Sequence, residues 1–133
     1  AQALGICEAA YNCARNYSKE RIQFGKPISN IQAVQFLLAD MITKIDAASL
    51  LVLKAANLRM EGKNYTREAS EAKVFSAEAA MWITTKAVQV LGGNGYTKDF
   101  PAERYFRDAK ITEIYEGTSE IQRVVIASSI LRN

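Results

Sequence analysis

The sequence of 133 residues contains no histidine. This absence excludes catalysis by a histidine acid or base, Ser–His catalytic triads and most transition-metal sites. Any catalysis by this chain must therefore rest on carboxylates, Arg, Lys, Tyr or a bound cofactor. The only two cysteines, Cys7 and Cys13, are six residues apart, a spacing that fits neither a redox pair nor a zinc knuckle. We expect them to be half-buried thiols in a reducing compartment.

Proline is also scarce, and the sequence has no low-complexity tract. Because 49% of the residues are apolar, the chain can bury a core of its own. The net charge of +3 is spread along the chain without a basic run, so neither nucleic acid nor an anionic membrane is an expected partner. No apolar stretch reaches the roughly 18 residues of a membrane span, and no signal peptide is visible. Since residue 1 is Ala and the apolar pattern begins at once, we expect a piece of a longer protein.

Apolar residues recur at steps of three and four along most of the chain, which predicts helices. The first long helix covers about residues 1–21, and it is stopped by the Gly and Pro that follow. The second starts after Ser29 and ends near Gly62. The third runs from about Thr66 to the glycine-rich stretch 92–95, which ends it. Residues 101–110 form a short irregular or helical stretch, and a last helix opens after residues 118–119.

Helix-capping patterns accompany three of these predicted starts. Ser29 with Gln32, and Ser119 with Gln122, have the spacing of a capping box. Thr66 is expected to be an N-cap. No segment alternates as a strand between hairpin turns. Four long helices with short connections predict an all-α fold, an antiparallel four-helix bundle.

Two segments differ from an ordinary bundle sequence. Arg21 stands where a helix ends, and its cation suits the C-terminal dipole of that helix; it is equally explained as a capping residue before a turn. Residues 92–95 contain three glycines, more than one helix end requires. Backbone without side chains can approach a phosphate closely, although a flexible turn would explain the same glycines.

A third segment surrounds Glu116, which lies between an apolar pair and Gly117, just ahead of the last predicted helix. The helix dipole stabilises a carboxylate at this place, whereas burial against an apolar substrate destabilises it. A balance of the two effects can leave a base that works near neutral pH. An acidic residue preceding a capped helix is the simpler interpretation.

Taken together, these segments resemble the C-terminal domain of the acyl-CoA dehydrogenase family. The resemblance is carried by R-I-Q-F-G-K-P-I at residues 21–28, Q-V-L-G-G-N-G-Y at 89–96 and R-D-A-K-I at 107–111. The most specific part is I-Y-E-G-T-S-E-I-Q-R at 114–123. The match extends over essentially all 133 residues, and the short-chain, butyryl-CoA-like branch is nearest. It implies that residues 1–133 are the helical C-terminal domain of a chain that also has an N-terminal helical domain and a middle β-domain.

In this family FAD lies between the middle domain and the bundle and reaches a neighbouring subunit. The resemblance implies that Glu116 removes the α-proton of the acyl-CoA thioester, that its own backbone N–H binds the thioester carbonyl, and that Gly117 adjoins the substrate. Thr118 and Glu120 match positions that line the FAD of the same subunit. The positions matching contacts with the FAD of a partner subunit are Arg21, Gln23, Phe24, Ile31, Gln32, Gln89, Gly92 and Gly93.

The family further implies an electron-transfer flavoprotein as electron acceptor, a homotetramer, and a place in the bacterial cytoplasm or the mitochondrial matrix. The isolated chain is expected to be inactive because it holds only part of each site. Two alternatives stay open from the sequence. One is a dehydrogenase acting on glutaryl-CoA or a branched acyl-CoA. The other is a non-catalytic helical interaction module, which would need neither a cofactor groove nor Glu116.

Overall fold

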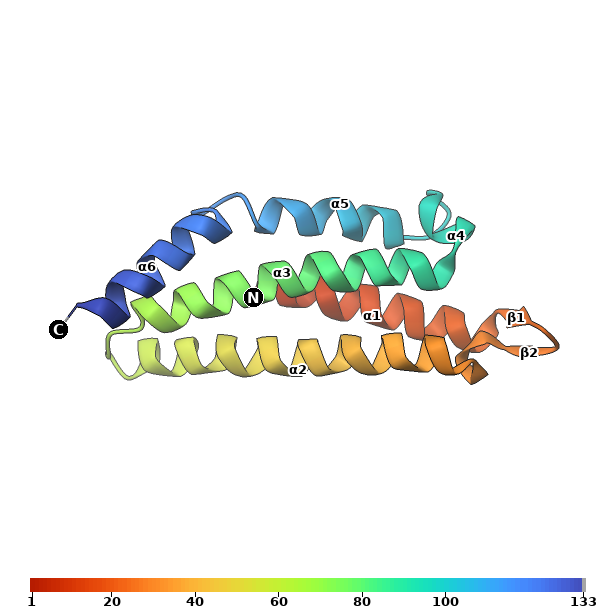
Figure 1. The fold of residues 1–133 in the computed structure, drawn as a ribbon, viewed down its shortest axis with the longest axis horizontal. Coiled ribbons are helices and arrows are strands. Elements are labelled where there is room, and N and C mark those ends of the chain that lie inside the picture. Colours follow the sequence, from red (N-terminus) through yellow and green to blue (C-terminus); the bar gives the residue numbers. More distant parts are fainter. Residues whose placement is uncertain (133) are drawn as a thin grey trace.

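The computed structural model describes residues 1–132 and consists mainly of five helices. They are α1 (Gln2–Glu20), α2 (Gln32–Met60), α3 (Thr66–Leu91), α5 (Ala102–Thr112) and α6 (Ser119–Leu131). Figure 1 shows that successive long helices run in opposite directions, with α5 and α6 together occupying the fourth position. The predicted antiparallel four-helix bundle is therefore confirmed, and its fourth helix is interrupted between α5 and α6.

Short elements fill both turns at one end of the bundle. A two-residue hairpin of β1 (Ile22–Gln23) and β2 (Lys26–Pro27) is followed by the 3₁₀ turn η1 (Ile28–Asn30), and α4 (Gly93–Tyr96) follows α3. The sequence predicted no strands, because two paired residues are too few to show alternation. The hairpin turns through Phe24 and Gly25, whose φ angles are 53° and 75°.

The predicted caps are shifted or absent in the structure. Ser29 lies within η1, and α2 begins only at Gln32, so the capping box at Ser29 is wrong. The carbonyl of Ser29 instead accepts a hydrogen bond from Gln35 Nε2 at 2.9 Å. Thr66 is the first residue of α3 rather than its N-cap, and its N–H donates to Asn64 Oδ1 at 3.1 Å.

The cap of α6 is one residue earlier than the sequence predicted. Thr118, not Ser119, is the N-cap residue, and its Oγ1 accepts the N–H of Ile121 at 3.3 Å. Ser119 is the first helical residue and is buried. The capping chemistry is the predicted one, because a β-hydroxyl accepts the N–H three residues later. It fixes the start of α6 three residues beyond Glu116.

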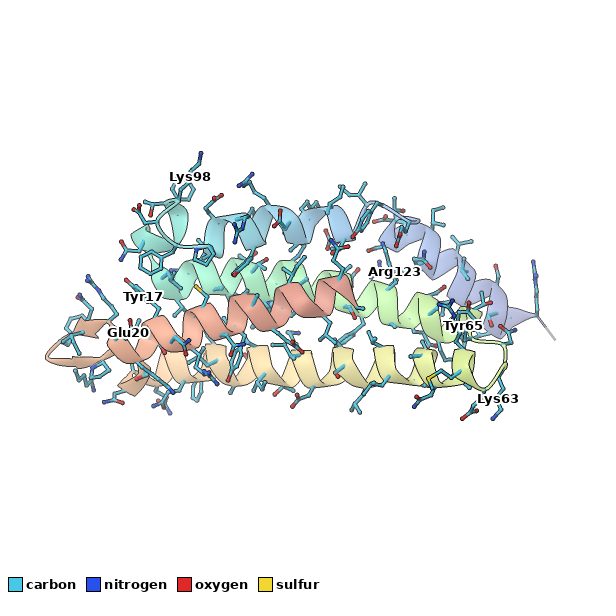
Figure 2. The ribbon with its side chains drawn as sticks, turned by 180° about the vertical axis from the view of Figure 1, so that it is seen from behind. Tyr17, Glu20, Lys63, Tyr65, Lys98 and Arg123 are labelled. Carbon is cyan, nitrogen blue, oxygen red and sulfur yellow. The ribbon has the colours of Figure 1, made fainter. Side chains whose placement is uncertain are left out.

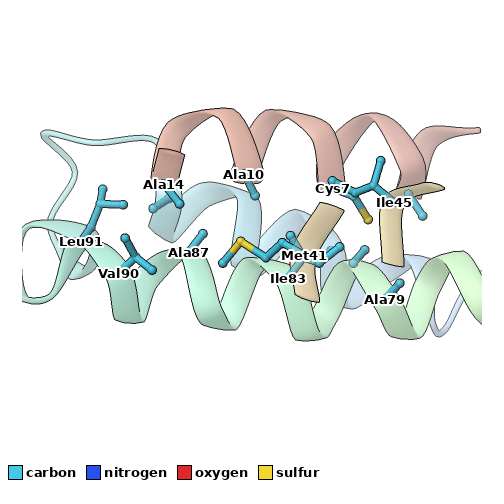
Figure 3. Packing of buried hydrophobic residues seen from close by; sticks show 14 of the residues in the cluster. Cys7, Ala10, Ala14, Met41, Ile45, Ala79, Ile83, Ala87, Val90 and Leu91 are labelled. Carbon is cyan, nitrogen blue, oxygen red and sulfur yellow. The ribbon is translucent and has the colours of Figure 1, made fainter. Parts of the chain in front are cut away.

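Helix α3 lies at the centre of the bundle and packs against α1, α2, α5 and α6. Figure 3 shows the core where Ile83 of α3 and Met41 of α2, both fully buried, meet α1. Fully buried alanines such as Ala10 and Ala80 allow the helices to approach closely, because interaxial distance follows side-chain size. Cys7 is fully buried rather than half-buried, and burial raises the pKa of its thiol to about 12.

The chain begins near the middle of α3, so α1 covers only the C-terminal half of that helix (Figure 1). The N-terminal half of α3 is flanked by α2 and α6. The link between α5 and α6 passes over α3 close to the first residues of α1. Within residues 1–132 no helix has the length and apolar character to cross a membrane.

Candidate active site

Glu116 stands on a strained loop that joins α5 to α6. Its φ angle is 54°, in the left-handed region that residues other than glycine rarely occupy, and Gly117 follows with φ 90°. Such a conformation costs of the order of 1–3 kcal/mol and persists only where the surroundings impose it. Among non-glycine residues 1–132, only Phe24 shares this feature.

Three hydrogen bonds hold this loop in place. Ser119 N–H donates to Glu113 O at 3.0 Å and closes the loop across its base. Gln122 Nε2 donates to Glu116 O at 3.0 Å. Tyr115 N–H donates to Ile111 O at 3.1 Å and continues the last turn of α5. The backbone of Glu116 is therefore fixed from both helices.

The functional groups of Glu116 remain uncommitted within the described chain. Its side chain is exposed and enters no ion pair or hydrogen bond among residues 1–132. Its N–H donates to no backbone acceptor in the same range. A carboxylate and an N–H donor are thus presented together, which is the combination that a proton abstraction next to a carbonyl requires.

A pocket of about 250 Å³ lies beside this loop. It is open to solvent at Glu116 and runs between the start of α1, the C-terminal half of α2 and the N-terminal half of α3. Small apolar side chains make most of its wall, and the polar groups gather toward the loop. The lining residues are Ala1, Gln2, Ala3, Val52, Ala55, Ala69, Ala72, Lys73, Ser76, Ala77, Thr112, Tyr115 and Glu116.

Gly117 cannot carry a side chain without disturbing the contact that holds Glu116. A Cβ there would lie 2.7 Å from Gln122 Nε2, the group that holds Glu116 O. We expect Gly117→Ala to lower kcat of the full-length enzyme about 100-fold, because a misplacement of the order of 1 Å has that effect. Stopped-flow turnover measures it. Gly5→Ala is the control, since Gly5 is helical with open space around it and should keep full activity. Equal activity of both variants would contradict the role of Gly117.

The hairpin and the glycine turn meet at the far end of the bundle. A second cavity, of about 420 Å³, brings Arg21 and Gln23 together with Gly92 and Gly93. Tyr17, which is labelled in Figure 2, also lines this cavity, and its hydroxyl accepts a hydrogen bond from Asn94 Nδ2 at 2.9 Å. Segments that are 70 residues apart in the chain thus form one surface, with an exposed guanidinium beside bare backbone.

The remaining predicted residues are distributed differently. Gln89 lines a separate cavity between α3 and α5. Phe24 and Gln32 are exposed at the hairpin end, whereas Ile31 packs partly against the core. Thr118 and Glu120 lie on the outer side of the α5–α6 link, in a small polar cavity with Ser119.

The Glu120 carboxylate accepts hydrogen bonds from its own backbone N–H and from the Thr118 hydroxyl, which lower its pKa. The predicted residues thus do not form one site. Glu116 borders one pocket, Thr118 and Glu120 line a separate polar cavity, and Arg21, Gln23, Gly92 and Gly93 form a distant surface at the hairpin.

Sequence reasoning missed four polar residues of the pocket beside Glu116, which are Gln2, Lys73, Ser76 and Thr112. Gln2 accepts a hydrogen bond from the Tyr115 hydroxyl, which ties α1 to the loop. Thr112 is buried below the loop, and its hydroxyl donates to Ala109 O at 2.7 Å. Lys73 was detectable in principle, because a lysine interrupts the alanine-rich stripe that α3 turns to its neighbours. Nothing in the sequence pointed to Gln2, because its hydrogen-bond partner Tyr115 lies 113 residues away in the chain.

Comparison with known proteins identifies the family. Residues 1–131 match the family model of the acyl-CoA dehydrogenase C-terminal domain. The short-chain specific acyl-CoA dehydrogenase of Clostridium acetobutylicum is 56% identical over 99% of this chain and 35% of its own length. The mitochondrial short-chain specific enzyme of Bos taurus is 53% identical over 99% of this chain and 32% of its own length.

A solved structure of butyryl-CoA dehydrogenase from Megasphaera elsdenii superposes with a TM-score of 0.97 at 52% identity, over 98% of this chain and 34% of that one. The chain thus spans about a third of the length of the curated relatives it matches. The sequence and the helical bundle of this chain both match those of acyl-CoA dehydrogenases. The chain belongs to the acyl-CoA dehydrogenase family, whose C-terminal domain it constitutes.

Proposed function

We propose that this chain is the base-bearing domain of a flavin-dependent dehydrogenase that oxidises short-chain acyl-CoA thioesters between the α- and β-carbons. The observation that carries the proposal is the free carboxylate and free N–H of Glu116 on a strained loop beside a pocket. The pocket is lined mainly by small apolar side chains, which suit an acyl group. The short-chain specificity of the relatives points to a short one.

In this proposal Glu116 takes the α-proton, and its backbone N–H stabilises the negative charge that develops on the thioester oxygen. Such a proton is a poor acid in water, so a preformed donor at the carbonyl lowers the barrier. Gly117, held in its left-handed conformation, lets the loop approach the substrate closely. The Tyr115 hydroxyl, bonded to Gln2, fixes the ring next to the base.

FAD would supply the acceptor for the β-hydrogen, which leaves as hydride. The residues at the hairpin end fit such a group. A Cβ at Gly92 or Gly93 would meet nothing within 4 Å, so internal packing does not explain these glycines. Bare backbone beside the Arg21 guanidinium suits a pyrophosphate. Arg21, Gln23, Phe24, Ile31, Gln32, Gln89, Gly92 and Gly93 would contact the FAD of a partner subunit, and Thr118 and Glu120 that of the same subunit.

The assembly is part of the proposal. The parent enzyme would add an N-terminal helical domain and a middle β-domain, and it would form a homotetramer in the bacterial cytoplasm or the mitochondrial matrix. Exposed apolar side chains on α2 and α6, including Leu50, Leu53, Val124 and Ile130, offer surface for such packing. An electron-transfer flavoprotein would accept the electrons. A chain in a structure of the electron transferring flavoprotein of Acidaminococcus fermentans is 57% identical to this one, with a TM-score of 0.98.

The test is a comparison of substrates on the full-length enzyme with an artificial electron acceptor. We expect butyryl-CoA to be oxidised with a higher kcat/KM than octanoyl-CoA, glutaryl-CoA or a branched acyl-CoA. A preference for glutaryl-CoA would replace the short-chain assignment by the alternative one. Absence of turnover with every thioester, in enzyme that contains FAD, would refute the proposal.

The isolated chain of 133 residues serves as the matched control for the same proposal. Because it holds only part of each FAD site, it should bind FAD weakly or not at all. Spectrophotometric titration, followed by gel filtration, measures the bound flavin. A stoichiometric yellow complex of this chain alone would contradict the division of the site between domains and subunits.

Reduction of a double bond next to a thioester is a second candidate function. The acryloyl-CoA reductase (NADH) of Anaerotignum propionicum is 53% identical to this chain over 132 residues, as similar as several short-chain dehydrogenases. In this direction Glu116 would give a proton to the α-carbon instead of taking one. Assays of acryloyl-CoA with NADH, set beside butyryl-CoA oxidation, decide which direction prevails.

A further inference from the structure

Lys73 is a half-buried residue whose ammonium group is buried and has no hydrogen-bond partner among the described residues. It projects from α3 into the pocket that Glu116 borders, and its Nζ is inaccessible to solvent. No carboxylate among residues 1–132 forms an ion pair with it within 4 Å. A buried charge without a counter-charge is costly. Such a residue in a pocket therefore calls for a functional explanation.

The acidic groups that act on Lys73 come from the end of α5, the link that follows it and the first turn of α6. They are Glu113, Glu116 and Glu120. The residues that α1 and α2 bring to the pocket carry no charged side chain. Burial lowers the pKa of Lys73, while these three carboxylates oppose the shift.

Two of the three carboxylates are already engaged. Glu113 accepts a hydrogen bond from Lys110 Nζ at 2.6 Å. Glu120 is held by its own N–H and by the hydroxyl of Thr118. Glu116 alone has no partner among the described residues. The two uncommitted charges of the pocket are therefore Lys73 and Glu116, and they have opposite sign.

We propose that Lys73 is the positioning residue for Glu116, drawing its carboxylate toward the pocket. This inference rests on the proposed function of Glu116 as the base. An ammonium group on the rigid central helix can do this without making a salt bridge, since its Nζ is shielded from water and charges at a protein surface attract each other more strongly than in bulk water. Contact with the reacting atoms stays with Glu116.

The pH profile of kcat/KM in the full-length enzyme tests the proposal. Its acid limb reports protonation of the base in the free enzyme. Since Lys73 favours the ionised carboxylate, Lys73→Met should move this limb to higher pH by about one unit, the lower end of what a nearby charge produces. Lys73→Arg keeps the charge, so its acid limb should stay with that of the wild type. FAD absorbance and Tm confirm that each variant is folded.

A second measurement titrates Glu116 without relying on turnover. Carbodiimides react with protonated carboxyl groups, so the pH dependence of labelling at Glu116, read by mass spectrometry, should shift by the same amount in Lys73→Met. If Lys73→Met does not fold, Lys73→Gln takes its place in both measurements. Coincident pH profiles and labelling curves for wild type and the neutral variant would overturn the proposal. If the neutral variant had a lower Tm but kept the acid limb of the wild-type pH profile, the role of Lys73 would be structural only.

The two proposals fail in different ways. If Glu116 is not the base, Glu116→Gln turns over normally, whatever Lys73 does to the labelling curve. If only the inference on Lys73 is wrong, Glu116→Gln is inactive while Lys73→Met keeps the acid limb of the wild type.

Discussion

Glu116→Gln in the full-length enzyme is expected to abolish dehydrogenation while FAD stays bound. Removing a general base costs at least about 10²–10⁴-fold in rate. The amide keeps the size of the side chain and leaves the backbone N–H in place, so substrate binding should change little. Because Glu116 makes no ion pair in the described chain, folding should be unaffected. Single-turnover flavin reduction with butyryl-CoA measures the chemical step directly.

Glu113→Gln is the matched control for this experiment. Glu113 lies three residues earlier on the same link between α5 and α6, and its carboxylate pairs with Lys110 instead of facing substrate. Its loss should cost little, because exposed ion pairs contribute at most about 1 kcal/mol. Turnover of Glu116→Gln at the rate of the wild type, or equal losses in both variants, would refute the assignment of the base.

Ile83→Ala should be the most damaging of the conservative core substitutions. Ile83 is fully buried on α3, where α1 and α2 meet it. Truncating such a side chain to alanine costs about 2–5 kcal/mol, because the apolar contacts are lost and the surrounding helices close the cavity only in part. Urea unfolding followed by far-ultraviolet circular dichroism measures this change as a lower midpoint with an unchanged slope.

Leu50→Ala serves as its control on α2. Leu50 is 69% exposed in this chain, so its truncation should leave the free energy of unfolding within about 0.5 kcal/mol. If the same leucine lies in a subunit interface of the full-length enzyme, the variant will weaken assembly instead of folding. If Ile83→Ala lowered the free energy of unfolding as little as Leu50→Ala does, α3 would not be the centre of the bundle.

The helices could be predicted from the sequence because their apolar spacing repeats over many turns. The limits of α3 at residues 66 and 91 agree with the prediction, since the glycine turn leaves no ambiguity. Local capping was less predictable. Ser29 has a suitable sequence context, but the 3₁₀ turn that precedes α2 removes it from the capping position. Tertiary packing against α1 decides where α2 begins, and no window of sequence contains that information.

Glu116 could be singled out because Gly117 and a helix cap surround it in the sequence. The strained φ angle of Glu116 and its unpaired N–H could not be predicted, because both follow from how α5 and α6 are held on α3. Lys73 illustrates the same limit. A lysine in an alanine-rich stripe is visible in the sequence, but its burial becomes apparent only when the link between α5 and α6 passes over it.

Helix α6 has one main support, which is α3. Arg123 of α6 reaches Glu78 of α3, as Figure 2 allows the reader to follow, while apolar side chains such as Ile121 and Val124 remain exposed. This lightly attached helix also carries Gln122, the side chain that holds the carbonyl of Glu116. The position of Glu116 therefore depends on how firmly α6 docks on α3, so a partner that covered the outer face of α6 would also steady Glu116 without touching it.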